Sequence, residues 1–118
     1  MNKPRKIQKP LTASHEETVL ALLRRDPAFR KATLLGAVEE LLTGEPYVAR
    51  AKLRRLIAAT IGFPAMAKST NIHEKSLQRM LGPKGNPTTG NLLTIIRVLA
   101  EQEKVTFAIK EAKTRKAA

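Results

Sequence analysis

Apolar residues recur every three or four positions along most of the chain, which is the periodicity of helices with one buried face. A first helix is expected to begin after Ser14, since Ser14 and Glu17 have the spacing of a capping box. A second helix is expected over 27–42, because Asp26 can cap the free amides of its first turn and Pro27 suits its first position. The buried stripe expected for the second helix consists of Phe29, Ala32, Leu35, Val38, Leu41 and Leu42.

Glycine and proline residues mark the boundaries of the next elements. Gly44 is expected to end the second helix, and Pro46 is expected to begin a third helix that ends at Gly62. The third helix would bury one apolar side and expose the other. Its solvated face would then hold the basic residues Arg50, Lys52, Arg54 and Arg55.

The remaining pattern predicts three more helices and one strand. The helices are expected over 64–70, 74–81 and 90–101. Apolar residues then alternate with Thr and Ala over 105–109, which is the period of a strand. A single strand needs a pairing partner to be stable. The pattern therefore predicts an all-α fold, a compact bundle of about five to six helices, with a short C-terminal strand.

Composition agrees with one helical domain between two basic ends. The chain has 118 residues, of which 42% are hydrophobic and only 3% aromatic, so the core must be aliphatic. We expect a flexible basic arm over 1–13, a single helical domain over 14–110 and a flexible basic tail over 111–118. The chain has no cysteine and no apolar run near the roughly 20 residues of a membrane span. A cytoplasmic location without a membrane partner is therefore expected.

The net charge is strongly positive. Lysine and arginine number 22 against 10 acidic residues, which gives a formal net charge of +12. The positively charged side chains repel one another in the folded state, and binding a polyanionic partner relieves this repulsion. Nucleic acid is the leading candidate. A membrane surface, an acidic protein or solubility alone are alternatives that charge does not separate.

Residues 64–81 have the pattern of a helix-turn-helix. Two helices that cross closely need a small side chain at the crossing, which Ala67 supplies. The turn residue four positions later often needs a positive φ, which asparagine tolerates best after glycine, and Asn71 lies there. Ile72 would anchor the turn, and His73 would be a weak N-cap of the next helix. That helix would lie in the major groove of DNA.

The expected DNA contacts lie on this second helix and on the loop that follows it. Lysine and arginine suit guanine, glutamine suits adenine, and glutamate can accept from cytosine. The candidates for base readout are Glu74, Lys75, Ser76, Gln78 and Arg79, with Lys75, Gln78 and Arg79 preferred. Thr88 or Thr89 can cap the last helix, whose free amides attract phosphate. The candidates for contacts with the DNA backbone are Lys68, His73, Lys84, Asn86, Thr88, Thr89 and Asn91.

Ordinary helix packing is the alternative explanation of this motif, and catalysis is disfavoured. His73 and Ser76 are close on one helix, but no buried acid completes a triad. Gly82 and Gly85 lack the Gly-Lys-Ser/Thr ending of a phosphate loop. With His15 as the only other histidine, a metal site is not expected. We therefore expect no enzyme activity, no metal and no cofactor.

Three stretches resemble a known family. They are Ala-Thr-Ile-Gly-Phe-Pro-Ala-Met-Ala over 59–67, Lys-Ser-Leu-Gln-Arg-Met-Leu-Gly-Pro-Lys-Gly-Asn-Pro over 75–87, and Asn-Leu-Leu-Thr-Ile-Ile over 91–96. Together with Arg-Asp-Pro-Ala-Phe-Arg over 25–30, they resemble the antidote (antitoxin) proteins of bacterial addiction modules, a branch of the Xre/lambda-repressor-like helix-turn-helix proteins. The resemblance is best over 55–103.

The resemblance implies a helical bundle that binds an operator as a homodimer and neutralises a small toxin encoded beside it, often one that cleaves mRNA. It also implies that residues 73–76 and Arg79 face DNA. The chain departs from the family at the turn, with Asn71 for glycine, and at the cap, with His73 for serine or threonine.

The sequence thus predicts a dimeric, DNA-binding transcriptional regulator, an antitoxin that controls its own promoter. The alternative is a protein-interaction module that mainly sequesters a small toxin, through the strand 105–109 or the helix 15–25. A third hypothesis is a nonspecific RNA-binding or ribosome-associated protein, which the shortage of aromatic residues disfavours.

Overall fold

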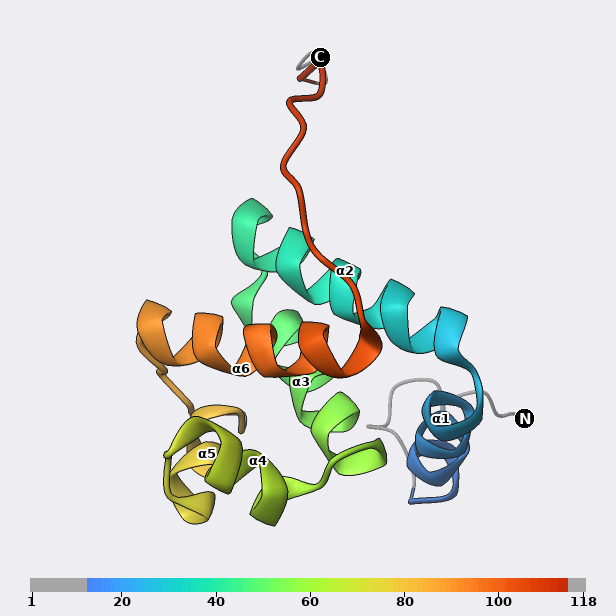
Figure 1. Cartoon of the computed structure of the whole chain (residues 1–118), viewed down its shortest axis with the longest axis vertical. Helices are drawn as coiled ribbons and strands as arrows, with labels where there is room; N and C mark the ends of the chain where they lie inside the picture. The colour runs from blue at the N-terminus through green and yellow to red at the C-terminus, as the bar shows by residue number, and fades with distance from the viewer. Residues whose placement is uncertain (1–12, 115–118) are drawn as a thin grey trace, which may run out of the picture.

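The computed structural model describes residues 13–114, and most of them are helical (Figure 1). The all-α prediction is confirmed, and the described residues contain no strand. The predicted arm over 1–13 lies outside the described residues except for Ala13, and the predicted tail over 111–118 lies outside them beyond 114. The helices are α1 (Ala13–Arg25), α2 (Pro27–Thr43), α3 (Pro46–Ala59), α4 (Phe63–Thr70), α5 (Glu74–Met80) and α6 (Thr89–Glu103).

Side-chain caps form at the starts of α2 and α6, as the sequence predicts. The Asp26 carboxylate accepts hydrogen bonds from the amides of Ala28, at 3.0 Å, and Phe29, at 3.2 Å. The Thr88 hydroxyl accepts from the amide of Asn91 at 3.0 Å and caps α6. Each cap satisfies amides that the first helical turn leaves without a backbone partner.

Several predicted helix boundaries lie one to three residues from those of the structure. Helix α1 begins at Ala13, so Ser14 lies inside the first turn and its carbonyl accepts from the Thr18 hydroxyl at 3.0 Å instead of capping the helix. Helix α3 ends at Ala59, and Gly62, with φ of 84°, donates its amide to the Ile57 carbonyl of the last turn of α3 at 2.7 Å and directly precedes α4. Glycine adopts this positive φ without the steric cost that a side chain would bring.

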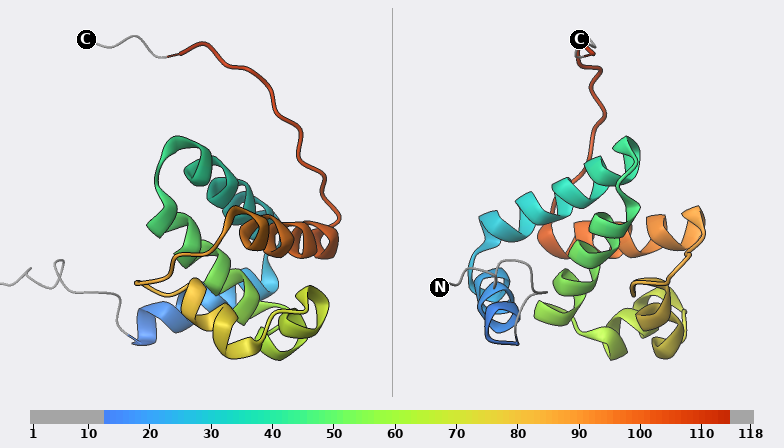
Figure 2. Two further views of the ribbon diagram at one scale, coloured as in Figure 1. Left: turned by 90° about the vertical axis from the view of Figure 1, so that its left-hand side faces the viewer. Right: turned by 180° about the vertical axis from the view of Figure 1, so that it is seen from behind.

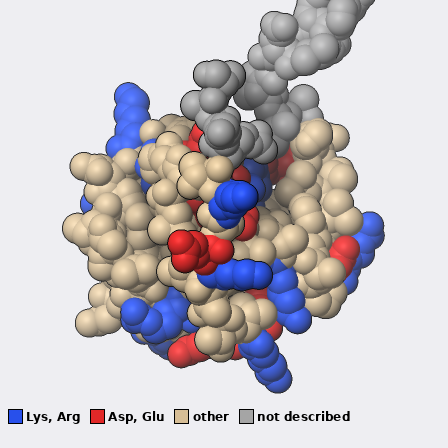
Figure 3. Space-filling view, turned by 90° about the horizontal axis from the view of Figure 1, so that it is seen from above, with Lys and Arg blue, Asp and Glu red and all other residues tan. Residues whose placement is uncertain are grey.

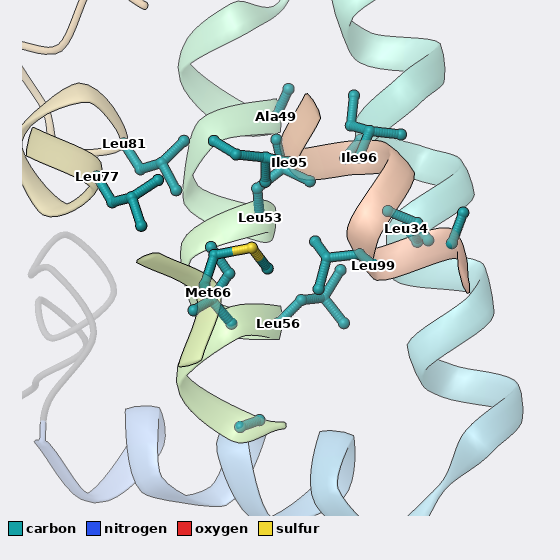
Figure 4. Close-up of a cluster of buried hydrophobic side chains, with 14 of the residues drawn as sticks. Leu34, Ala49, Leu53, Leu56, Met66, Leu77, Leu81, Ile95, Ile96 and Leu99 are labelled. Atoms are coloured by element: carbon teal, nitrogen blue, oxygen red, sulfur yellow. The ribbon is translucent and has the colours of Figure 1, made fainter. Parts of the chain in front are cut away.

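Helix α3 provides the centre of the core. It contacts α1, α2, α4 and α6, and its side chains Leu53 and Leu56 are fully buried. Figure 4 shows these two side chains between Leu77 on one side and Leu99 on the other. The buried core residues are Leu, Ile, Ala and Met, as the low aromatic content requires.

The buried face predicted for α2 is wrong in part. The core covers Leu34 and Ala37, whereas Leu35 and Leu42 are exposed. Helix α2 carries apolar residues around most of its circumference. Periodicity therefore does not decide which side is buried, and the positions of α3 and α6 decide it.

The basic residues of α3 do not form a solvated face, contrary to the prediction. The ammonium group of Lys52 pairs with Glu40 at 2.8 Å, and the guanidinium of Arg55 pairs with Glu16 at 3.2 Å. These pairs link α3 to α2 and α1. The half-buried basic residues of this helix are Arg50, Lys52, Arg54 and Arg55.

The C-terminal strand predicted over 105–109 does not form. Lys104 adopts a left-handed conformation with φ of 57° and ends α6, and residues 105–114 have no regular secondary structure. Val105 and Phe107 are half-buried against the core, whereas Ile109 is 87% exposed. Figure 2 shows the segment leaving the body of the protein. Its alternating pattern places Val105 and Phe107 against the core, but residues 13–114 offer no neighbouring strand to pair with it.

An ion pair joins α2 to the end of α6. The Arg30 Nε donates to the Glu103 carboxylate at 2.9 Å, and Arg30 Nη1 donates to the carbonyls of Leu23, at 2.9 Å, and Arg24, at 3.0 Å. Glu103 is only 8% exposed. A buried carboxylate is costly unless it is paired, so Arg30 holds the ends of three helices together.

Replacing Arg30 with methionine should destabilise the fold, because it leaves Glu103 buried without its cation. We expect Arg30→Met to lower the free energy of unfolding by about 2–4 kcal/mol. Urea denaturation followed by circular dichroism measures this. Lys31→Met is the matched control, because Lys31 is exposed and forms no ion pair among residues 13–114. Equal losses in the two variants would contradict the assigned role of Arg30.

Candidate nucleic-acid interface

A tight turn joins α4 to α5. Asn71 has φ of 59° and ψ of 34°, so the predicted left-handed residue of the turn is confirmed. Asparagine bears this conformation at lower cost than other side chains. The next residue, Ile72, is half-buried against the core and anchors the turn.

The start of α5 is capped as predicted. The His73 Nδ1 accepts a hydrogen bond from the amide of Lys75 at 3.3 Å. Leu77 is fully buried, as is Met66 of α4. The Thr70 hydroxyl, in the last turn of α4, donates to the Met66 carbonyl at 2.7 Å. The turn, the cap and one apolar face therefore hold α5 in place.

The opposite side of α5 is open to solvent. Lys75, Gln78 and Arg79, the three preferred base-reading residues, are exposed, while Glu74 and Ser76 are half-buried. The guanidinium of Arg79 lies 3.5 Å from the Ser76 hydroxyl, and neither Lys75 nor Arg79 forms an ion pair with any residue that the structure describes. These cationic side chains are available to an external ligand.

Arg54 of α3 holds the other end of α5, a role that sequence reasoning missed. Its Nη1 donates to the Leu81 carbonyl at 2.9 Å, and Leu81 is fully buried. A cation is favourable beside the carbonyl end of a helix. The two residues lie 27 positions apart in sequence, so no local pattern reveals this contact.

A polar hollow of about 360 Å³ lies between α5, the following loop and the start of α6. It brings together two candidates for base readout and four candidates for backbone contact. They are Ser76 and Arg79 of α5, Lys84, Asn86 and Thr88 of the loop and Asn91 of α6.

The other predicted site residues lie outside this hollow. Lys75 and Gln78 occupy the exposed side of α5, and Lys68, at the end of α4, is exposed too. The remaining three are Glu74, the cap residue His73 and Thr89.

The electrostatics of the hollow suit an anion. Two cations line it, Lys84 and Arg79, and no carboxylate does. The N-terminus of α6, beside Thr88, adds the positive end of a helix of 15 residues. A phosphate oxygen in this position would meet charge and hydroxyl donors together.

Gly85 gives the hollow its shape. Its amide donates to the Gly82 carbonyl at 3.0 Å. A Cβ at Gly85 would overlap the carbonyl of Met80 and lie 2.7 Å from that of Arg79. Only glycine therefore allows the loop to fold back against the end of α5.

Comparison with known proteins adds no assignment, since no family model, curated protein or solved structure matches the chain. Within residues 13–114, no group of three or more His, Cys, Asp or Glu could hold a metal ion. No helix in that part of the chain is long and apolar enough to cross a membrane.

A methyl group at Gly85 should distort the hollow. We expect Gly85→Ala to lower the free energy of unfolding by about 1–3 kcal/mol, because backbone must move to relieve the overlap. Thermal denaturation measures the loss, and amide chemical shifts of Arg79, Asn86 and Thr88 report the distortion. Gly90→Ala is the matched control, since the nearest atom to its Cβ lies 3.9 Å away. Similar losses in both variants would show that close packing at Gly85 is unimportant.

Proposed function

We propose that this protein is a sequence-specific DNA-binding regulator in which α4 and α5 act as a helix-turn-helix. The observation that carries the proposal is the two-sided environment of α5. Buried Leu77 and the Arg54 contact hold one side, while Lys75, Gln78 and Arg79 remain free on the other. Cationic and amide side chains are the ones that recognise purine edges in the major groove.

The hollow beside α5 supplies the phosphate contacts in this proposal. Lys84 provides charge, and Asn86 and Thr88 provide polar groups near the start of α6. Such contacts position a protein on the duplex without reading sequence. Further backbone contacts come from Lys68, His73, Thr89 and Asn91. The net charge of +12 supports affinity for a polyanion.

We further propose an antitoxin that acts at its own promoter in the cytoplasm. The resemblance of residues 55–103 to antidote proteins supports this narrower assignment. It also supports a homodimer on an operator whose half-sites are about one helical turn apart. The proposal assigns the chain no catalytic role.

Sequestering a small toxin is the second candidate function, with DNA binding secondary. The segment 105–114 favours it, because this extended chain leaves the body and carries Ile109 almost fully exposed. Extended segments of this kind bind by adding a strand to a partner's sheet. Co-purification with the product of a neighbouring gene, lost in a chain that ends at Lys104, tests this candidate.

Removing the Arg79 side chain should weaken binding to an operator selected from random duplexes. We expect Arg79→Ala to reduce affinity by about 10- to 100-fold and to relax the preference at one base pair. Arg97→Ala is the matched control, since Arg97 is an exposed arginine outside the hollow, and it should reduce affinity by less than about threefold. Fluorescence anisotropy at fixed salt measures both.

Competition experiments separate this proposal from nonspecific binding. Unlabelled operator should displace labelled operator at lower concentration than random duplex or RNA does. Equal displacement by all three competitors, or equal losses in Arg79→Ala and Arg97→Ala, would overturn the proposed base readout.

A further inference from the structure

The end of the molecule farthest from α5 has an unusual composition. The chain contains 22 lysine and arginine residues, yet none lies between Ala32 and Ala49. This stretch forms the second half of α2 and the start of α3. Figures 1 and 2 show the turn between these helices at the opposite end of the body from α4 and α5. We call residues 35–48 the α2–α3 tip.

Large apolar side chains are exposed at the α2–α3 tip. It holds four of the six exposed large hydrophobic residues in the described part of the chain. Two of them, Leu35 and Leu42, are seven positions apart and share one face of α2. The exposed fractions are 46% for Leu35, 70% for Leu42, 59% for Tyr47 and 38% for Val48.

The free charges of the tip are negative. Glu39 and Glu45 are exposed and form no ion pair among the described residues. The third carboxylate, Glu40, pairs with Lys52 at 2.8 Å. The next cation along the chain, Arg50, lies over the Tyr47 ring, 5.9 Å from its centroid.

A view from above shows the charged side chains on this face of the molecule. In Figure 3, Lys and Arg and also Asp and Glu side chains are scattered among broad stretches of neither charge. The free carboxylates Glu39 and Glu45 repel DNA phosphates, and the apolar side chains beside them offer phosphates no attraction. The α2–α3 tip is therefore unsuited to the ligand that the rest of this basic chain attracts.

We propose that the α2–α3 tip is a docking surface for a basic protein partner, which presents an amphipathic helix with lysine or arginine beside its apolar stripe. The ridge made by Leu35 and Leu42 is about two helical turns long, which suits a helix lying against it. Free Glu39 and Glu45 complement cations at the edges of that stripe.

A second copy of this chain is a poorer occupant. A symmetric contact presents the same patch from both copies, which would bring the free carboxylates Glu39 and Glu45 of the two copies close together. The repulsion would oppose the apolar contact. Because the tip lies far from α5, the partner and DNA can bind together, and the inference does not rest on the proposed function.

The test uses the ¹⁵N-labelled full chain and two synthetic helical peptides, each about four turns long. Both carry the same leucine stripe, flanked by lysine in one and by glutamate in the other. We expect the lysine peptide to shift the amide resonances of residues 35–48 and the glutamate peptide to leave them unchanged. Raising the salt concentration should weaken the lysine peptide's binding.

Substitutions on the exposed surface locate the contact. We expect Leu42→Gln to reduce the affinity for the lysine peptide at least about tenfold. The double variant Glu39→Gln with Glu45→Gln should reduce it by at least as much. Leu93→Gln is the matched control, because Leu93 is another exposed leucine, at 49%, but lies on α6, outside the tip, and it should retain full affinity. Circular dichroism confirms that each variant is folded.

Four outcomes would overturn the inference. The first is no shift at the tip with either peptide, and the second is equal shifts with both. The third is shifts at the tip that grow with protein concentration alone, which would assign the surface to a second copy. The fourth is shifts caused by ending the chain at Ala108, which would assign it to the chain's own C-terminal segment.

Discussion

Burial of α3 among its neighbours is the interaction on which the rest of this structure depends. Leu53 and Leu56 meet apolar side chains from the helices around them, and α3 packs against α1, α2, α4 and α6. The basic side chains of α3 also bind its neighbours, because Lys52 pairs with a carboxylate on α2 and Arg55 with one on α1. A helix that is apolar on one side and cationic on the other thus binds neighbours with both.

The exposed helix α5 depends on this centre. Seven residues are too few for a helix that is stable alone in water. Its conformation comes from the His73 cap, from the burial of Leu77 and from the Arg54 contact at its last turn. Because these groups lie at its ends and on one face, the other face keeps Lys75 and Arg79 unpaired within the described chain. One side of α5 therefore stabilises its helical conformation, and the other side leaves Lys75 and Arg79 available to a ligand.

Charge is divided along the molecule in a way that composition alone does not reveal. The hollow beside α5 has cations and no carboxylate, while the α2–α3 tip has free carboxylates and exposed leucines. Between them, Arg30, Lys52 and Arg55 are used within the fold. Some of the positive charge is thus neutralised by ion pairs that stabilise the fold. The ligands proposed for the two ends differ because the unpaired charges at those ends have opposite signs.

The sequence by itself determined the features whose causes lie within a few residues. Asp26, Asn71, His73 and Thr88 act on amides or turns that adjoin them, so their residue type and position were sufficient. Tertiary structure alone decided which side of α2 is buried, that the basic residues of α3 are paired, and that 105–109 has no strand to join. Those outcomes depend on groups brought close by folding from distant parts of the chain, and periodicity carries no information about where such neighbours lie.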